Sequence, residues 1–193
     1  MKKNLKTLVI FVILGALIIG FYYYVSNRDL SGSRSSKDPL VVEAKELMSK
    51  RIVTNYPQTP VEVVTLYLRI NKAYYMTKLS SDEIAKLGDQ ALILFDSELL
   101  NYNPRDEFIS RLKEDISAYR KDNRYISEYS VEKNSEVDYK SLGKRQYALV
   151  DTVIYLREGN KLTPVSQRFT LRKDDNGNWK ILGCKNSSVA DAS

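Results

Sequence analysis

A run of 21 uncharged residues, from Thr7 to Asn27, limits the structures that the N-terminal part of this 193-residue chain can form. As an α-helix the run would be roughly 31 Å long, which matches the hydrocarbon thickness of a bilayer. Lys2, Lys3 and Lys6 precede it without any acidic residue. Because such positive charge is kept in the cytoplasm, the pattern predicts a single-pass membrane protein with a cytoplasmic N-terminus and an extracytoplasmic C-terminal domain.

A cleaved secretory signal is the alternative interpretation of this run. A signal would have an apolar core of about 7 to 15 residues, followed by small residues at the cleavage site. The bulky segment Tyr22–Val25 stands there instead, which favours an uncleaved anchor. The predicted organisation is a cytoplasmic stub and anchor (1–27), a flexible linker (28–38), one extracytoplasmic domain (39–186) and a disordered tail (187–193).

Composition narrows the range of functions. The chain has no histidine, so the commonest general base and the commonest zinc ligand are both missing. The net charge is +6, and the three anchor lysines account for half of it, which is too weak an excess to predict a nucleic-acid partner. Cys184 is the only cysteine, and we expect it to be unpaired and partly buried. We therefore expect no metal and no cofactor, and a binding role rather than an enzymatic one.

Helix signals come first in the domain and strand signals follow. Capping residues and a helical apolar period predict helices in four segments (39–53, 59–77, 80–99 and 103–119). Alternating aromatic and β-branched residues predict strands in four more (125–133, 145–157, 165–173 and 178–185). This order indicates an α+β fold with three or four helices on one face of a curved antiparallel sheet. Whether the first helix packs on the domain or forms a stalk is left open.

A turn at Gly159 and Asn160 predicts the register of one hairpin. If residue 158 faces 161, then Asp151 faces Arg168, unless Pro164 introduces a bulge. Asp151 is an acid in an otherwise apolar strand. We favour a structural ion pair for it, and a catalytic acid is the alternative.

Two resemblances follow from these segments. The predicted helices, with a closing hairpin that contains Phe169–Lys173 and Asn178–Leu182, resemble the nuclear transport factor 2-like (cystatin-like) superfamily. The stretch Asn55–Val64 is similar to an uncharacterised bacterial family of single-pass membrane-anchored proteins. The first resemblance implies a cone between helices and sheet. The candidate residues that line it are aromatic, with plain core packing as the alternative (Tyr67, Tyr74 and Trp179).

Side-chain parity places a second candidate site on the outer face of the sheet. Phe169 and Leu171 should face the helices, which leaves three basic residues outside (Arg168, Arg172 and Lys180). They could contact an acidic envelope protein or an anionic wall polymer, or form an ordinary solvated face. The leading hypothesis is a membrane-anchored, extracytoplasmic, non-enzymatic binding or scaffold domain that self-associates. A small-molecule-binding protein or enzyme that uses the cone is the alternative.

Overall fold

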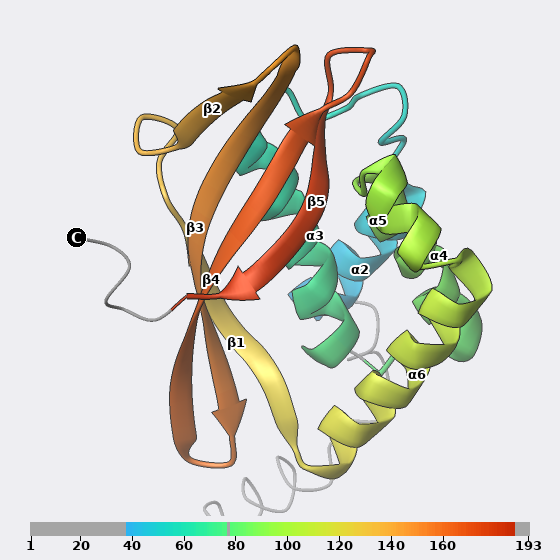
Figure 1. Cartoon of the computed structure of the whole chain (residues 1–193). Coiled ribbons are helices and arrows are strands. Elements are labelled where there is room, and N and C mark those ends of the chain that lie inside the picture. The colour runs from blue at the N-terminus through green and yellow to red at the C-terminus, as the bar shows by residue number, and fades with distance from the viewer. Residues whose placement is uncertain (1–37, 77, 188–193) are drawn as a thin grey trace, which may run out of the picture. The chain divides into compact units, whose positions relative to one another are not determined.

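The structure is a computed structural model that describes residues 38–76 and 78–187 (Figure 1). Its helices are α2 (Pro39–Ser49), α3 (Pro60–Met76), α4 (Ser81–Ile93), α5 (Ser97–Tyr102) and α6 (Arg105–Lys121). Its strands are β1 (Arg124–Val131), β2 (Asp138–Leu142), β3 (Arg145–Glu158), β4 (Lys161–Lys173) and β5 (Trp179–Asn186). The predicted anchor at 7–27, nearly all of the linker and the tail beyond Ser187 lie outside the described residues. Within the described residues, no helix combines the length and hydropathy that a membrane span requires.

The predicted starts of two helices are confirmed. At α3 the Thr59 hydroxyl accepts the Glu62 N–H at 3.2 Å, and the Glu62 carboxylate accepts the Thr59 N–H at 3.2 Å. At α4 the Ser80 hydroxyl accepts the Glu83 N–H at 3.3 Å, and the Glu83 carboxylate accepts the Ser80 N–H at 2.8 Å. Both are reciprocal capping boxes, so side chains close in sequence satisfy the free amides of each first turn.

The helix predicted over 80–99 is in fact two helices. After Ile93 the chain leaves the helix and pairs with β5: Ile181 N–H donates to the Leu94 carbonyl, and Asp96 N–H donates to the Ile181 carbonyl, both at 2.8 Å. Leu99 therefore lies on the separate short helix α5. The prediction of one continuous helix was wrong because hydrogen bonds to a distant strand replace helical ones at this point. Five helices, instead of three or four, are found among the described residues.

Helix α2 packs on the rest of the domain and is not a stalk. Its Ala44 and Leu47 side chains are buried, and its Glu43 forms a 3.0 Å ion pair with Arg69 of α3. The helix ends at Ser49, which is earlier than predicted. Glu46 of α2 also reaches Arg69, at 3.8 Å. The helix is thus held by an apolar stripe and by partly exposed ion pairs with Arg69.

The antiparallel sheet has the order β1-β3-β4-β5, and β2 pairs with the first part of β3. The predicted hairpin register is confirmed, because Asp151 lies opposite Arg168. Pro164 lies opposite Tyr155 without a bulge in this ladder. It is tolerated because β5 pairs with β4 only from Gln167 onward, so the Pro164 side that lacks an N–H needs no partner. Strand β2 was not predicted, since all five of its residues are exposed and no alternation marks it.

The helices cover one face of the sheet, and the core lies between them (Figure 1). Phe169, Leu171, Trp179 and Ile181 are all buried on this face, as side-chain parity predicts. Helix α3 is the central helix, because it contacts β1, β3 and β5. The α+β class and the antiparallel sheet are therefore confirmed.

Candidate functional site

The predicted basic residues on the outer face of the sheet have different partners. Arg168 makes two hydrogen bonds with the Asp151 carboxylate, at 2.7 Å and 2.6 Å. The two residues face each other across β3 and β4, so local hairpin geometry brings their charges together. Asp151 is thus one half of a structural ion pair, and Arg168 is already neutralised.

Arg172 belongs to a largely buried charge network. Its guanidinium forms a two-fold ion pair with Asp96, with one contact at 2.9 Å, and reaches Glu98 at 3.1 Å. The Arg172 side chain is 11% exposed and that of Asp96 is 4% exposed. These hydrogen bonds raise the pKa of Arg172, so it stays charged. The same Asp96 carboxylate caps α5 by accepting the Glu98 N–H at 2.9 Å. The network therefore joins β4 to the junction of α4 and α5.

Lys180 lies opposite Arg172 on β5 but has no carboxylate partner in the described chain. Its ammonium donates to the Ile93 carbonyl at 2.8 Å, at the end of α4. It also lies 4.2 Å from the centre of the Tyr56 ring. Desolvation lowers the pKa of Lys180. The nearby charges of Asp174 and Asp96 partly oppose this lowering. A helix carbonyl and an aromatic face thus hold a half-buried cation that no carboxylate of the described residues contacts directly.

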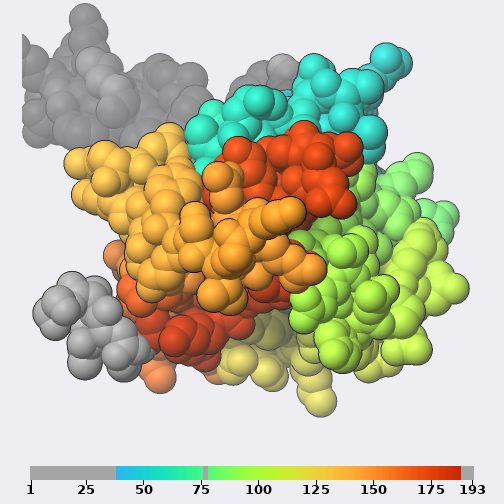
Figure 2. Space-filling model, turned by 45° about the horizontal axis from the view of Figure 1, so that its top comes forward, coloured from blue at the N-terminus to red at the C-terminus, as the bar shows by residue number. Residues whose placement is uncertain are grey.

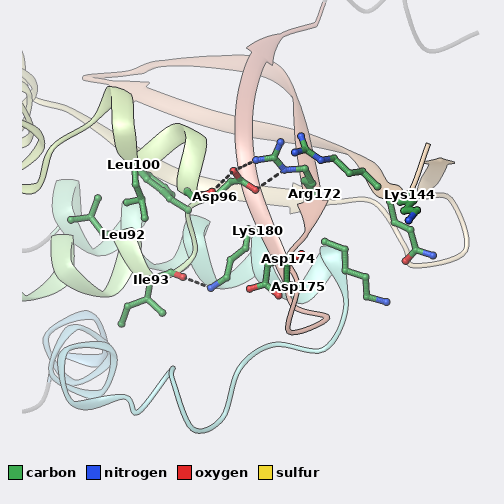
Figure 3. A pocket seen from close by; sticks show the side chains of 14 residues that line it. Leu92, Ile93, Asp96, Leu100, Lys144, Arg172, Asp174, Asp175 and Lys180 are labelled. Carbon is green, nitrogen blue, oxygen red and sulfur yellow. Dashed lines mark hydrogen bonds and ion pairs between the residues drawn. The ribbon is translucent and has the colours of Figure 1, made fainter. Parts of the chain in front are cut away.

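Arg172 and Lys180 line a cleft of about 540 Å³, which we call the charged cleft (Figure 3). It lies between the α4–α5 junction and the ends of the β2–β3 and β4–β5 hairpins, which come together on one face of the domain (Figure 2). Its apolar side chains come from the two helices and their junction (Leu92, Ile93, Phe95 and Leu100). Its other basic residues come from the two hairpins (Lys144, Arg145 and Lys173). Arg168 does not line it.

Two of the three carboxylates that line the charged cleft already have partners within the chain. Asp96 is held by Arg172, and Asp174 accepts the N–H groups of Asn176 and Asn178 at 2.9 Å and 2.8 Å. Asp175 is the exposed acid of the turn. Among the described residues, none of the four cations Lys144, Arg145, Lys173 and Lys180 forms an ion pair. The alternation of side chains along β4 and β5 predicted two basic residues of this cleft, Arg172 and Lys180. It did not predict Lys144 and Arg145, because they belong to the β2–β3 hairpin, which the sequence pattern did not reveal.

A second hollow of about 430 Å³, the uncharged cavity, lies among α3, α6 and the sheet. Its polar lining consists of phenols, amides and a thiol (Tyr67, Asn71, Tyr75, Tyr119, Gln167, Cys184 and Asn186). Its apolar lining is contributed by the sheet (Ile126, Ile154, Leu156, Val165 and Phe169). No charged residue lines it in the part of the chain that the structure describes. Burial raises the pKa of both Tyr67 and Tyr75, so the two phenols stay protonated near neutral pH.

The residues predicted to line the cone are not brought together. Tyr67 lines the uncharged cavity, whereas Tyr74 is 1% exposed in the core, where its hydroxyl has no hydrogen-bond partner in the described structure. Trp179 lines a different pocket of about 290 Å³, beside Tyr139 of β2. Cys184 is unpaired, as expected, but it is exposed and not partly buried. Helical spacing could not show that Tyr67 of α3 lines a cavity while Tyr74 of the same helix is buried in the core, because the packing of α3 against the sheet decides this.

Residues 1–184 match a family described as a domain of unknown function (DUF6715). The chain belongs to this family. None of the curated proteins compared with the chain matches it. A solved structure with some likeness is that of a mutant of the helical cell shape determining protein Pgp2 from Campylobacter jejuni, with 14% identity and a TM-score of 0.35. The match covers 64% of this chain and 40% of that one, so the chain spans less than half of the Pgp2 chain. This likeness carries no argument about function.

Proposed function

We propose that this protein is a membrane-anchored, extracytoplasmic binding domain that holds an acidic segment of an envelope protein in the charged cleft. One observation carries the proposal. Lys144, Arg145, Lys173 and Lys180 converge on the cleft without an ion-pair partner among the described residues. An acidic peptide would relieve the mutual repulsion of these charges, and its apolar side chains would cover Leu92 and Leu100.

The chemistry of the cleft favours binding over catalysis. The chain contains no histidine, and the buried carboxylate of Asp96 is already paired with Arg172. Exposed charges such as Lys144 and Arg145 contribute modestly each, about 0.2–1 kcal/mol, and chiefly select the sign of the partner. Affinity would then come from several such contacts together with the apolar floor. This is the pattern of a recognition surface.

The proposed cellular location of the domain is inferred from the sequence. Residues 7–27, which lie outside the described residues, would anchor the chain and leave the domain on the extracytoplasmic side. The uncharged cavity between the sheet and the helices supports the cone-like arrangement implied by the nuclear transport factor 2-like resemblance. Self-association in the membrane plane is part of the proposal, as expected of a scaffold.

Photocrosslinking in intact cells tests the charged cleft. A photoreactive residue at Gln146, an exposed and uncharged position of the cleft, should yield a protease-sensitive adduct with a specific envelope protein. The double variant Lys144→Glu/Arg145→Glu should abolish the adduct. The matched control Lys161→Glu, an exposed charge at the other end of β3 and β4, should keep it. A protease-resistant adduct would show a wall polymer instead, and an adduct unaffected by the double variant would refute the proposal.

The uncharged cavity favours a second candidate function, the carriage of an uncharged small molecule. Its volume is in the range of ligand sites, and its lining offers hydrogen bonds without charge. Since the phenols of Tyr67 and Tyr75 stay protonated near neutral pH, neither would act as a general base, which favours a carrier over an enzyme. Native mass spectrometry should then detect a molecule that copurifies with the wild type but not with Val165→Trp, which fills the cavity.

A further inference from the structure

The second half of β5 presents main-chain groups at the edge of the sheet that pair with no other group of the described residues. Ser187 N–H donates to the Ser166 carbonyl of β4 at 2.9 Å. In an antiparallel ladder the residues that bond to the partner strand alternate with residues whose N–H and C=O point away from it. With Gln167 opposite Asn186 and Phe169 opposite Cys184, the N–H and C=O of Cys184 and Asn186 therefore point away from β4. Figure 1 shows β5 as the last strand on this side.

The first half of the same edge already binds an extended segment of this chain. Ile181 exchanges hydrogen bonds of 2.8 Å with Leu94 and Asp96 in a parallel bridge. Beyond it, no main-chain group among the described residues pairs with the outer edge of Cys184 or Asn186. Gly183 stands between the two parts, and a Cβ there would meet no atom within 4 Å. The edge therefore continues past its internal partner with room for another backbone to approach.

The uncharged cavity opens beside this free edge. Cys184 lies opposite the buried Phe169, so its side chain is on the helix-covered face, and Cys184 and Asn186 both line the cavity. A strand added next to them would place every second side chain on that face. Because no charged residue lines the cavity, it would accept an apolar or aromatic side chain and exclude a charged one.

We propose that the edge of β5 at residues 184–186 binds an extended segment of a partner polypeptide as an additional strand. One uncharged side chain of that segment enters the cavity. Main-chain hydrogen bonds supply affinity and the cavity supplies specificity, which is how strand addition works in general. The cavity shares no lining residue with the charged cleft, so this proposal is independent of the binding function proposed for that cleft, whereas it competes for the cavity with the carriage of a small molecule.

The test uses full-length protein and heptapeptides selected from a random phage-displayed library. The best peptide is synthesised with blocked ends, and its Kd is measured by calorimetry. Cys184→Pro deletes the outward N–H together with the thiol, at a sheet edge where proline is tolerated, whereas Cys184→Ala deletes the thiol and keeps the N–H, so the difference between the two variants reports on the backbone of residue 184. We expect Cys184→Ala to bind within about twofold of wild type, and Cys184→Pro to bind at least about tenfold more weakly. N-methylation of alternate peptide amides and Val165→Trp should weaken binding as well.

Retained circular dichroism shows that Cys184→Pro still folds, and Asn186→Pro replaces it if it does not. A selected peptide that binds Cys184→Pro and wild type equally would overturn the proposal. So would a failure to select any peptide. A dimer that sedimentation detects in the wild type and that Cys184→Pro abolishes would also overturn it, because the occupant would then be a second copy of this chain.

Discussion

Replacing Asp96 by alanine should cost more stability than replacing any exposed ion-pair partner. The Asp96 side chain is 4% exposed, and its removal leaves the 11% exposed side chain of Arg172 with Glu98 as its remaining carboxylate partner. Removal of one partner from a buried pair costs about 3–5 kcal/mol, and loss of an N-cap costs about 1 kcal/mol. Because Glu98 still offers Arg172 a carboxylate, we expect about 3 kcal/mol less free energy of unfolding.

Urea unfolding followed by the fluorescence of Trp179 measures this change. Trp179 is the only tryptophan and is 7% exposed, so its emission reports on the core next to the network. With a urea dependence of about 2 kcal/mol per molar, the unfolding midpoint should fall by roughly 1.5 M. The matched control is Asp89→Ala, which breaks the well-formed but exposed pair with Arg105 (2.6 Å) and should leave the midpoint nearly unchanged.

A double-mutant cycle separates the ion pair from the cap. Arg172→Met alone leaves the Asp96 charge buried, whereas Arg172→Met with Asp96→Ala leaves no buried charge. The double variant should therefore lose about 2 kcal/mol less than the sum of the two single variants. Strictly additive losses, or an Asp96→Ala loss no larger than that of Asp89→Ala, would refute the reasoning.

Three further predictions concern hydroxyl groups and can be measured in the same urea assay. Tyr74→Phe should stabilise the fold by about 1 kcal/mol because it removes a buried hydroxyl without a partner, whereas Tyr56→Phe should destabilise it by a similar amount, since that hydroxyl donates to the Trp179 carbonyl at 2.8 Å. An equal effect of both variants would contradict the first argument. Ser80→Ala should cost about 1 kcal/mol by breaking the capping box with Glu83, and a silent variant would show that the box is dispensable. Burial raises the folded-state pKa of five phenols above the reference value of 10.0 (Tyr56, Tyr67, Tyr74, Tyr75 and Tyr129). Their contribution to stability is therefore complete below about pH 10 and should be lost as the pH rises further. The pKa of Lys180 is lowered, so this residue opposes the trend by adding stability as the pH rises to the lysine reference value, but it is one group against five. Stability that does not fall above pH 10 would contradict the prediction.

Local patterns in the sequence were sufficient for much of the fold. The capping boxes at Thr59 and Ser80 depend on residues three positions apart, and both are present. The register that pairs Asp151 with Arg168 follows from one tight turn, because a connected hairpin can slip only by changing that turn. Such features involve neighbours along the chain, so no long-range contact is needed to predict them.

The sites needed the tertiary structure. Asp96 and Arg172 are 76 residues apart, and the helical period of residues 80–99 gave no sign that the chain would break at Leu94 to pair with β5. Strand β2, which positions Lys144 and Arg145, is exposed throughout and so carries no hydrophobic alternation. The sequence by itself determined most of the helical and extended segments and one hairpin register, because these depend on nearby residues. Only the tertiary structure decided which charges are neutralised, which remain free around the cleft, and which edge of β5 stays open, because each depends on groups that only the folded packing brings together.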